Sequence, residues 1–356
     1  AEMAESVDAA DSKSAAERRK GSSPFLGTKA QRSSKNAHKY TMALQPDSAE
    51  TSADNPAESL IGRPSAREAW WQALRPKTLS VSFSPVLVGS AIAYAETGAL
   101  LLWPALLALL AAVLIQIGTN LHNDVSDFER GADTPDRLGP PRATAMGWLP
   151  AQAVRRAAWS AFVLAFLLGI LLVVRGGWPI VCIGLASLAA GWAYTGGPRP
   201  IAYTPLGELF VMVFFGLAAV GGSYYLQTLM LSPSALLAAL MLGAFAAAVI
   251  SVNNTRDLAT DARAGKHTLA VFLGRQAMNR VYVAELLLPF MLLPLLAVSV
   301  GRAWWVALPL LAAAPAFRLY RLFSAMPAGR GFNALLGETA RLQAVFALLL
   351  ALGLAV

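Results

Sequence analysis

Nine stretches of about 20 mostly apolar residues run along this chain, and each is long enough to cross a bilayer as a helix. The chain has 356 residues, of which 56% are hydrophobic and only 14% are charged. A soluble domain cannot bury that much apolar surface, whereas a bilayer accepts it. We therefore predict an all-α polytopic membrane protein with nine transmembrane helices. The predicted spans are residues 79–97, 100–121, 154–174, 178–194, 205–226, 233–253, 278–300, 303–320 and 339–355.

The first part of the chain has a different composition. Residues 1–60 carry eight Lys or Arg and nine Asp or Glu, are rich in Ser and Ala, and have no apolar period. Such a segment buries too little apolar surface to fold. It is too acidic for an organelle transit peptide and lacks the apolar core of a secretory signal. We predict that residues 1–66 form a disordered N-terminal tail and that residues 67–356 form the nine-helix transmembrane domain.

Basic residues are distributed unevenly between the predicted loops. The loops after spans 2, 4, 6 and 8 contain fifteen Lys or Arg, whereas the loops on the other side contain only Arg175 and Arg302. An excess of Lys and Arg in short loops marks the cytoplasmic side. We therefore expect the N-terminus and the loops after even-numbered spans to be cytoplasmic and the C-terminus to lie outside. The net charge of +8 gives no reason to expect nucleic acid as a partner, because the basic residues are spread among these loops.

Acidic residues follow the same asymmetry. Asp124 and Asp127 come after span 2 at a spacing of three, and Asp257 and Asp261 come after span 6 at a spacing of four. Either spacing places two carboxylates on one helix face. Asparagines lead both stretches, since the first begins at Asn120 and the second begins four residues before Asp257. Such acids are usually solvated loop charges or helix caps, but two similar clusters on one side of the membrane favour a shared site.

Carboxylates this close repel one another unless a cation lies between them. Mg²⁺ prefers carboxylate and water oxygens and leaves positions for substrate phosphates. Lys and Arg suit phosphate oxygens. The single cysteine, Cys182, rules out a Cys-based metal site. We therefore predict a site that binds a diphosphate through bridging Mg²⁺, with basic partners at Arg137, Arg142, Arg256 and Lys266.

Four stretches of the sequence resemble a known family. They are RPKTLSVSFSPVLVGSAIAY at the start of span 1, NLHNDVSDFERGADTPDRLGPPRA after span 2, YTGGPRPIAYTPLGELFVMVFFG between spans 4 and 5, and NNTRDLATDARAGKHTLAVFLG after span 6. As a set they resemble the UbiA-type intramembrane aromatic prenyltransferases, and within them the 1,4-dihydroxy-2-naphthoate polyprenyltransferase branch of menaquinone biosynthesis. The resemblance covers residues 75–274 and implies helices arranged around a central lipid-accessible pocket.

The resemblance also implies roles for the two acidic stretches. Asp124, Asp127, Asp257 and Asp261 would hold Mg²⁺ and the polyprenyl diphosphate and would be the catalytic carboxylates. Other branches of the superfamily carry a further aspartate where Gly131 stands here, which favours the naphthoate branch over the hydroxybenzoate branch. The further residues of the implied diphosphate site are Asn120 and Asn123, which belong to the first motif, and Arg137 and Lys266, which would contact diphosphate oxygens.

The implied reaction transfers a polyprenyl group to 1,4-dihydroxy-2-naphthoate with loss of CO₂ and diphosphate and gives demethylmenaquinone. Mg²⁺ and cationic side chains would stabilise the departing diphosphate, and a pocket that opens to lipid would keep water from the allylic cation. The resemblance places the enzyme in the bacterial inner (plasma) membrane. The expected partners are the polyprenyl diphosphate, the aromatic acceptor and the lipid bilayer.

Residues of the other two stretches would border the acceptor. Tyr194 is the better candidate of two tyrosines, Tyr194 and Tyr203, because an aromatic ring face stabilises a nearby cation, although tyrosines are also common at membrane interfaces. Arg75 and Lys77 would either pair with the acceptor carboxylate or mark the inner membrane edge. Glu208 is an acid inside a span, which makes it a functional candidate that would order the pocket.

Two alternative functions remain open at this point. A cation-coupled transporter also has intramembrane acids, such as Glu208 and Glu285, and helices broken by Gly and Pro. Against it, the acids gather at one cytoplasmic edge and have no inverted counterpart. The second alternative is a prenyltransferase of the same type that acts on another aromatic acceptor, such as hydroxybenzoate, a haem or chlorin, or homogentisate.

Overall fold

The computed structural model describes residues 64–133, 137–301 and 304–356, and the regular secondary structure in these ranges is entirely helical. The predicted tail, residues 1–66, lies outside the described residues except for its last three. The elements are α1 (Ala66–Leu74), α2 (Pro76–Thr97), α3 (Leu102–Glu129), α4 (Ala151–Ala193), η1 (Ile201–Tyr203), α5 (Gly207–Val211), η2 (Met212–Gly221), α6 (Gly222–Thr228), α7 (Pro233–Arg256), α8 (Leu258–Arg263), α9 (Leu269–Val300), η3 (Trp305–Ala312), α10 (Ala313–Ala325) and α11 (Phe332–Ala355).

Eight helical segments of the described chain are long and apolar enough to cross a membrane. One of them, α4, has 43 residues, far more than one crossing needs. At Gly177 its backbone has φ 59° and ψ −148°, which glycine adopts without steric cost, and the chain reverses there. The two arms pack together, since a Cβ added at Gly191 would lie 3.2 Å from the Phe162 ring. α4 therefore supplies the predicted spans 154–174 and 178–194, and the described residues agree with nine transmembrane helices.

Local sequence signals set the ends of several helices. Pro76 occupies the first position of α2, where its missing N–H costs no hydrogen bond. The Ser232 hydroxyl accepts a hydrogen bond from the backbone N–H of Ala235 and so caps α7. Gly98 and Gly301 end α2 and α9 in the left-handed conformation that favours glycine. The turns between spans are thus fixed by residues that the sequence itself identifies.

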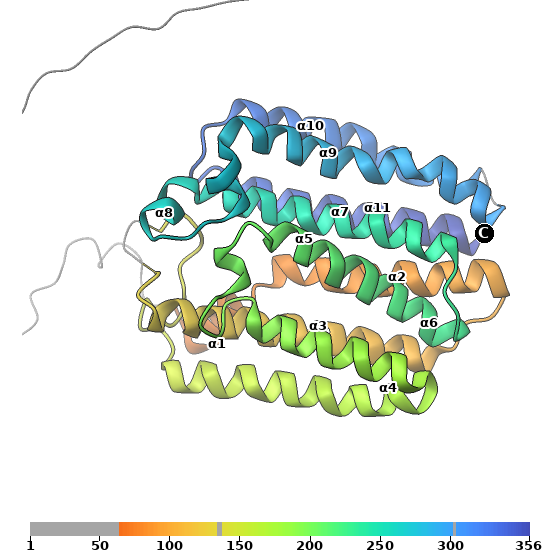
Figure 1. Ribbon diagram of the computed structural model, residues 1–356, viewed down its shortest axis with the longest axis horizontal. Helices are drawn as coiled ribbons and strands as arrows, with labels where there is room; N and C mark the ends of the chain where they lie inside the picture. The colour runs from red at the N-terminus through yellow and green to blue at the C-terminus, as the bar shows by residue number, and fades with distance from the viewer. Residues whose placement is uncertain (1–63, 134–136, 302–303) are drawn as a thin grey trace, which may run out of the picture. The chain divides into compact units, whose positions relative to one another are not determined.

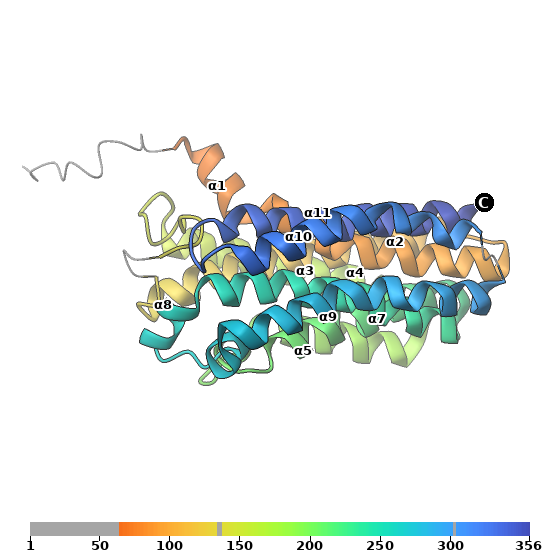
Figure 2. The ribbon, with the colours of Figure 1, turned by 90° about the horizontal axis from the view of Figure 1, so that it is seen from above.

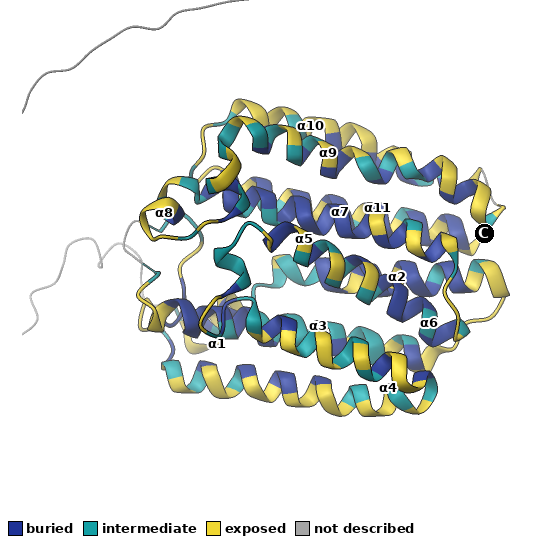
Figure 3. Cartoon of the chain, viewed as in Figure 1, coloured by how far each residue is buried: buried dark blue, intermediate teal, exposed yellow. Residues whose placement is uncertain are grey.

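The helices run side by side and leave two distinct ends (Figures 1 and 2). α7 packs against α9, α11 and η2 and is buried along most of its length (Figure 3). Apolar side chains on the outer helices are exposed, for example Leu171 on α4 and Phe317 on α10, as expected for a surface that faces lipid. One end carries α1, α8 and the loop after α3, and the C-terminus lies at the other (Figure 1). We call the first the acidic end, because Asp124 and Asp257 lie there.

The span made of α5, η2 and α6 contains a π-helical segment, Met212–Gly221. π-Helical turns are rare and occur frequently at functional sites. Phe214 and Phe215 of this segment line the large cavity described below. On the other side, a Cβ at Gly216 would come within 2.4 Å of the Ala239 carbonyl oxygen, so only glycine permits this close approach to α7.

The acidic end agrees with the prediction at the first motif and differs from it at the second. α3 continues to Glu129, beyond the predicted end of span 2, and so carries Asp124 and Asp127 on one helix, as their spacing predicted. α7 ends just before Asp257, which is its C-cap residue with φ −92° and ψ 6°, so Asp257 and Asp261 do not share one continuous helix. The backbone N–H of Asp261 still donates to the Asp257 carbonyl oxygen at 2.7 Å, which keeps the two residues within one turn.

Candidate active site at the acidic end

The first acidic motif is held in place by the loop that follows it. The Asp124 carboxylate accepts backbone hydrogen bonds from Thr144 at 3.0 Å and from Ala143 at 3.2 Å. The Asp127 carboxylate accepts one from Arg142 Nη2 at 2.6 Å and one from the Tyr203 hydroxyl at 3.1 Å. Both carboxylates are buried. The chain between α3 and α4 therefore folds back onto the helix end that carries the two aspartates.

The asparagines of the first motif tie α3 to two other segments. The Asn120 side chain donates to the Leu74 carbonyl oxygen at 3.0 Å, at the junction of α1 and α2. The Asn123 side chain accepts a hydrogen bond from the Thr195 hydroxyl, at the start of the loop after α4. Arg130 donates to carbonyl oxygens of the same loop, at Thr195 and Gly197. These bonds fix the loop after α4 over the acidic end of α3.

The second acidic motif has its own cationic partners. Buried Arg256 donates to both oxygens of Asp257, at 2.8 and 2.6 Å, and is held from the other side by Asn253 and Asn333. Because these bonds occupy four of the five N–H donors of the guanidinium, Arg256 chiefly orients Asp257. The carboxylate of Asp261 lies 3.8 Å from Lys266 Nζ.

Lys266 links the two motifs. Its Nζ lies 4.6 Å from the centre of the Tyr203 ring, and the Tyr203 hydroxyl donates to Asp127. Burial and the negative charge of Asp127 raise the pKa of Tyr203, so this hydroxyl stays protonated and remains a donor. The two acidic stretches, which are separated by four spans in the sequence, thus meet through one tyrosine and one lysine.

A cavity of about 1360 Å³ opens below the two motifs. At its far end it is lined by apolar residues of α4 and α6, among them Leu172, Ile180 and Leu226. All thirteen site residues predicted from the sequence line this one cavity: Arg75, Lys77, Asn120, Asn123, Asp124, Asp127, Arg137, Arg142, Tyr194, Arg256, Asp257, Asp261 and Lys266. The cavity is therefore polar and charged at the acidic end and mostly apolar along the rest of its length.

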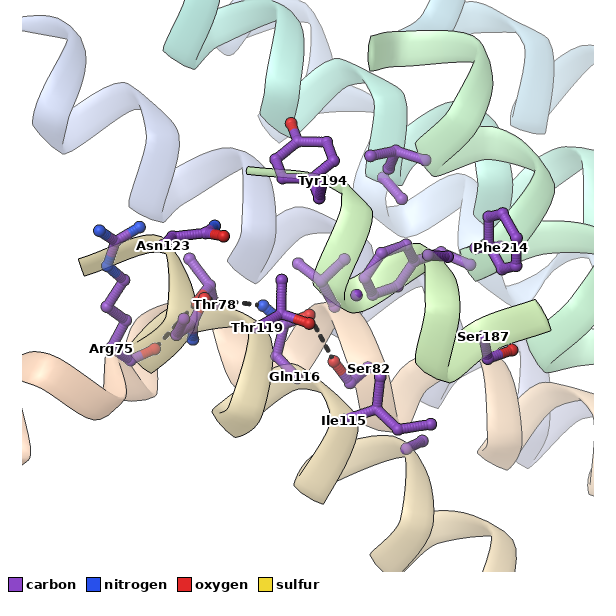
Figure 4. Close-up of a pocket in the computed structure, with 18 of the residues that line it drawn as sticks. Arg75, Thr78, Ser82, Ile115, Gln116, Thr119, Asn123, Ser187, Tyr194 and Phe214 are labelled. Atoms are coloured by element: carbon purple, nitrogen blue, oxygen red, sulfur yellow. Dashed lines mark hydrogen bonds between the residues drawn. The ribbon is translucent and has the colours of Figure 1, made fainter. Parts of the chain in front are cut away.

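Uncharged polar side chains form one wall between these two regions (Figure 4). The Ser82 hydroxyl donates to Gln116 at 3.1 Å, and the Gln116 amide donates to Asn120 at 3.0 Å. This chain of hydrogen bonds runs from α2 to the first acidic motif. Tyr194 and Phe214 line the same cavity (Figure 4).

Comparison with known proteins identifies the family. Residues 82–336 match the UbiA prenyltransferase family. The chain belongs to this family. It is 39% identical over 255 residues to the 1,4-dihydroxy-2-naphthoate octaprenyltransferase of Escherichia coli strain K12. The matched region covers 70% of this chain and 82% of that protein. It is 37% identical over 286 residues to the protein of the same name from Mycobacterium tuberculosis strain H37Rv, covering 80% of this chain and 96% of that protein.

The fold agrees with solved structures of the family. A UbiA homologue from Archaeoglobus fulgidus bound to GPP and Mg²⁺ matches with a TM-score of 0.59 at 16% identity, over 81% of this chain and 100% of that chain. The resemblance inferred from the four sequence stretches is therefore confirmed. The chain is an integral membrane protein of a prenyltransferase family, which removes the transporter alternative.

Asp133 contacts two of the site residues and was not among the thirteen predicted from the sequence. Its carboxylate pairs with Arg137 and lies 3.7 Å from Arg142 Nε, and its side chain is 2% exposed. Oδ2 of Asp133 is buried without a hydrogen-bond donor. Burial raises the pKa of Asp133 to about 6, against the lowering effect of Arg137. The signal available in the sequence was its position two residues after Gly131, where other branches carry an aspartate.

The donor set fits a divalent cation together with an anion. No three His, Cys, Asp or Glu side chains in the described ranges converge closely enough to hold one ion by themselves. Burial raises the pKa of Asp261 to about 6, so this carboxylate, like that of Asp133, lacks full charge compensation from the protein. Arg142 has the opposite deficit, because its Nε and Nη1 atoms are buried without a hydrogen-bond acceptor. A hard cation would satisfy the carboxylates and a phosphate would satisfy the guanidinium.

Proposed function

We propose that this protein transfers a polyprenyl group from a polyprenyl diphosphate to 1,4-dihydroxy-2-naphthoate in an Mg²⁺-dependent reaction. The products are diphosphate, CO₂ and demethylmenaquinone in its quinol form. The names of the bacterial relatives support the choice of acceptor. The Archaeoglobus fulgidus homologue, whose structure is described as bound to GPP and Mg²⁺, supports a prenyl diphosphate as the donor and a divalent cation as the cofactor.

One observation carries the proposal: charges of both signs are left incompletely partnered at the same end of the cavity. Arg142, which lines the cavity, has two buried nitrogens without an acceptor, and Asp261, which also lines it, lies 3.8 Å from its cationic partner Lys266. A diphosphate with bound Mg²⁺ carries both missing partners, since its oxygens accept hydrogen bonds and its cations attract carboxylates. The apolar remainder of the cavity suits the hydrocarbon tail of the same molecule.

In this proposal the residues of the acidic end bind and orient the leaving group. Asp124, Asp127, Asp257 and Asp261 would hold Mg²⁺, which when bound neutralises negative charge that develops on the diphosphate oxygens. Arg142 and Lys266 stabilise the same charge by hydrogen bonds that are already oriented before the reaction. The prenyl carbon–oxygen bond breaks, and its electron pair leaves with the diphosphate.

The walls of the cavity then control the allylic cation. The aromatic faces of Tyr194 and Phe210 stabilise positive charge, and the apolar lining excludes water that would capture the cation. A ring carbon of the acceptor forms the new carbon–carbon bond and gives up its proton. The carboxylate leaves as CO₂ and a proton takes its place, so atoms and charge balance. The chain supplies no nucleophile of its own in this sequence of steps.

The proposed location is the bacterial inner membrane, with the N-terminus and the acidic end in the cytoplasm. The excess of Lys and Arg in the loops at the acidic end supports this orientation.

The test is a prenyl-transfer assay with purified protein in detergent, Mg²⁺ and a prenyl diphosphate. The acceptors are 1,4-dihydroxy-2-naphthoate, hydroxybenzoate, homogentisate and a haem or chlorin precursor. We expect product with dihydroxynaphthoate, loss of activity in EDTA, and recovery when Mg²⁺ is added back. Turnover of another acceptor alone would contradict the acceptor assignment, and full turnover in EDTA would contradict the role of Mg²⁺.

A further inference from the structure

Two buried glutamates contact the central helix α7 in the same way. Asn254 of α7 donates from Nδ2 to Glu208 Oε1 at 2.9 Å, and Ser251, one turn earlier, donates from its hydroxyl to Glu285 Oε1 at 3.0 Å. In both glutamates the second oxygen, Oε2, is buried without a hydrogen-bond partner. Glu208 is 4% exposed and Glu285 is 8% exposed. Neither glutamate belongs to the diphosphate site described above.

The two pairs differ in one respect. Asn254 lines the cavity, whereas Ser251 and Glu285 do not. Glu208 does not line the cavity either, but it is hydrogen-bonded to Asn254, which does. A structural role, holding two helices together, fully explains the Ser251–Glu285 hydrogen bond. It does not explain why the corresponding bond on the next turn involves a carboxamide at the cavity wall.

The bond to Glu208 fixes the orientation of the Asn254 carboxamide. A carboxylate oxygen accepts hydrogen bonds, so the amide must turn its NH₂ group toward Glu208 and its Oδ1 away from it. Oδ1 makes no hydrogen bond to any described residue, although it belongs to a cavity-lining side chain. Asn254 therefore presents a hydrogen-bond acceptor to whatever occupies the cavity.

The cavity that Asn254 lines also suits an aromatic ligand. Phe210 lies two residues beyond Glu208. Its ring stacks on Tyr194 with a centroid distance of 6.3 Å and is tilted by 45° against Phe214 at 4.6 Å. All three rings line the cavity. An acceptor oxygen in a cavity that aromatic rings also line favours an aromatic ligand that carries a hydrogen-bond donor such as an O–H group. The prenyl diphosphate has no such donor on its hydrocarbon part, whereas a dihydroxylated aromatic acceptor does.

We propose that Glu208 is a positioning residue for the aromatic acceptor. It holds Asn254 so that Oδ1 accepts a hydrogen bond from an acceptor hydroxyl, and thereby sets which ring carbon faces the prenyl group. This inference rests on the proposed function, since it requires a hydroxylated aromatic acceptor. It assigns no proton transfer to Glu208.

The test compares Glu208→Ala, Glu208→Gln, Asn254→Ala and the double alanine variant with the matched pair Glu285→Ala and Ser251→Ala. For each, KM is measured separately for the acceptor and for the prenyl diphosphate, together with kcat and the thermal midpoint in detergent. We expect Glu208→Ala and Asn254→Ala each to raise the acceptor KM by up to about tenfold, the range of one hydrogen bond. The double variant should be no worse than either single one, because both act on the same bond.

The other variants separate positioning from structure. Glu208→Gln keeps a carbonyl oxygen that accepts from Asn254, so its acceptor KM should stay near that of the parent protein. Glu285→Ala and Ser251→Ala should lower the thermal midpoint without changing the acceptor KM. The two monomethyl ethers of the acceptor are then tested as competitive inhibitors. At least one of them should bind the parent protein more weakly than the unmethylated acceptor does. The same ether should bind Asn254→Ala as tightly as the unmethylated acceptor binds that variant.

Several outcomes would overturn the proposal. They are an unchanged acceptor KM in Glu208→Ala and Asn254→Ala, an equal effect of Glu285→Ala, a change confined to the KM of the prenyl diphosphate, or loss of turnover in Glu208→Gln. If Glu208→Ala does not fold, Glu208→Gln and Asn254→Ala still decide the question. If the parent protein does not prenylate dihydroxynaphthoate, the proposed function fails on its own. The same variants are then assayed with the acceptor that the panel identifies.

Discussion

Arg142 and Asp127 form a buried ion pair at the acidic end of the cavity, with Nη2 2.6 Å from Oδ2 and both side chains 7% exposed. The other oxygen of Asp127 accepts the Tyr203 hydroxyl. In this arrangement Asp127 has a protein partner on each oxygen, whereas Arg142 keeps two nitrogens free of hydrogen bonds. Arg142 is thus hydrogen-bonded to Asp127, with Asp133 3.7 Å from its Nε, while most of its donors make no hydrogen bond.

We predict that Arg142→Ala lowers both stability and activity. Removing one member of a buried ion pair leaves the other charge unpaired, which costs about 3–5 kcal/mol, and losing a donor to the leaving group costs about 10²-fold or more in kcat. The measurements are the thermal midpoint in detergent and steady-state prenyl transfer. The double variant Asp127→Asn with Arg142→Gln is the control, and it should recover stability but not activity. Recovery of both would show that the pair is only structural.

A second prediction concerns Asp124. Its carboxylate accepts the backbone N–H groups of Ala143 and Thr144, so Asp124→Ala leaves two buried donors unsatisfied. Each unsatisfied donor costs about 1–3 kcal/mol. We expect this variant to be inactive and less stable, with easier proteolysis of the loop after α3. Limited proteolysis beside an activity assay checks both, and a loop as resistant as that of the parent protein would contradict the anchoring role.

Asp261 should behave differently. Burial raises its pKa to about 6, above its ordinary value of 3.8, so its ionised form at pH 7 is disfavoured in the folded protein. A carboxyl with a raised folded pKa destabilises the fold above that pKa and less so as the pH falls through it. In EDTA at pH 7, Asp261→Asn should therefore have a thermal midpoint as high as that of the parent protein or higher, yet it should be inactive when both are assayed with Mg²⁺. A lower thermal midpoint would mean that Lys266 compensates this charge well.

The reversal at Gly177 leads to a prediction about topology. Nine crossings place Val356 and the loop near Arg142 on opposite sides of the membrane. Reporter tags at these two positions test this directly. A second measurement is whether single cysteines placed there are protected from a membrane-impermeant thiol reagent. We expect the Arg142 loop to be cytoplasmic, as the basic loops indicate. Both tags on one side would mean that α4 does not supply two crossings.

A last prediction concerns residues 1–60, which lie outside the described residues. Ordering such a segment costs about 1–2 kcal/mol per residue in backbone entropy, and its composition offers little apolar surface to offset this cost. Deleting residues 1–60 should therefore leave membrane insertion and prenyl transfer nearly unchanged. Deletion through Lys77 removes α1, whose Ala69 and Ala73 are buried against Leu121, and should abolish activity. Equal losses in the two truncations, normalised to protein level, would make the tail a working part of the enzyme.

The sequence was sufficient to predict the spans and thirteen of the residues that line the cavity. The lengths of the apolar stretches give the number of membrane crossings, and Gly177 permits the chain reversal that separates two of these crossings. The charged site residues also had to lie at the same end of the helix bundle, because the acidic side chains at the ends of the spans are on one side of the membrane. All thirteen predicted site residues therefore line one cavity.

The pairing of those residues could not be predicted, because it depends on contacts between distant parts of the chain. Asn333, at the start of α11, accepts a hydrogen bond from Arg256 and donates one to Leu138, 195 residues away. This contact leaves Arg256 committed to protein partners, whereas its sequence position suggested a phosphate ligand. The choice of Tyr194 over Tyr203 was uncertain for the same reason. Tyr203 contacts Asp127 directly, and Tyr194 packs against Phe210 farther into the cavity.

The junction of α1 and α2 shows how folding and turnover can impose opposite demands on one position. Arg75 adopts φ 54° and ψ 61° there, a conformation that costs a residue with a side chain about 1–2 kcal/mol. Glycine would make the same turn without strain but would leave that part of the cavity without a guanidinium. A library selected only for survival in detergent should therefore enrich Arg75→Gly, and a library selected for product should remove it. Substitutions that raise the stability of this enzyme without loss of activity would therefore have to lie elsewhere in the chain.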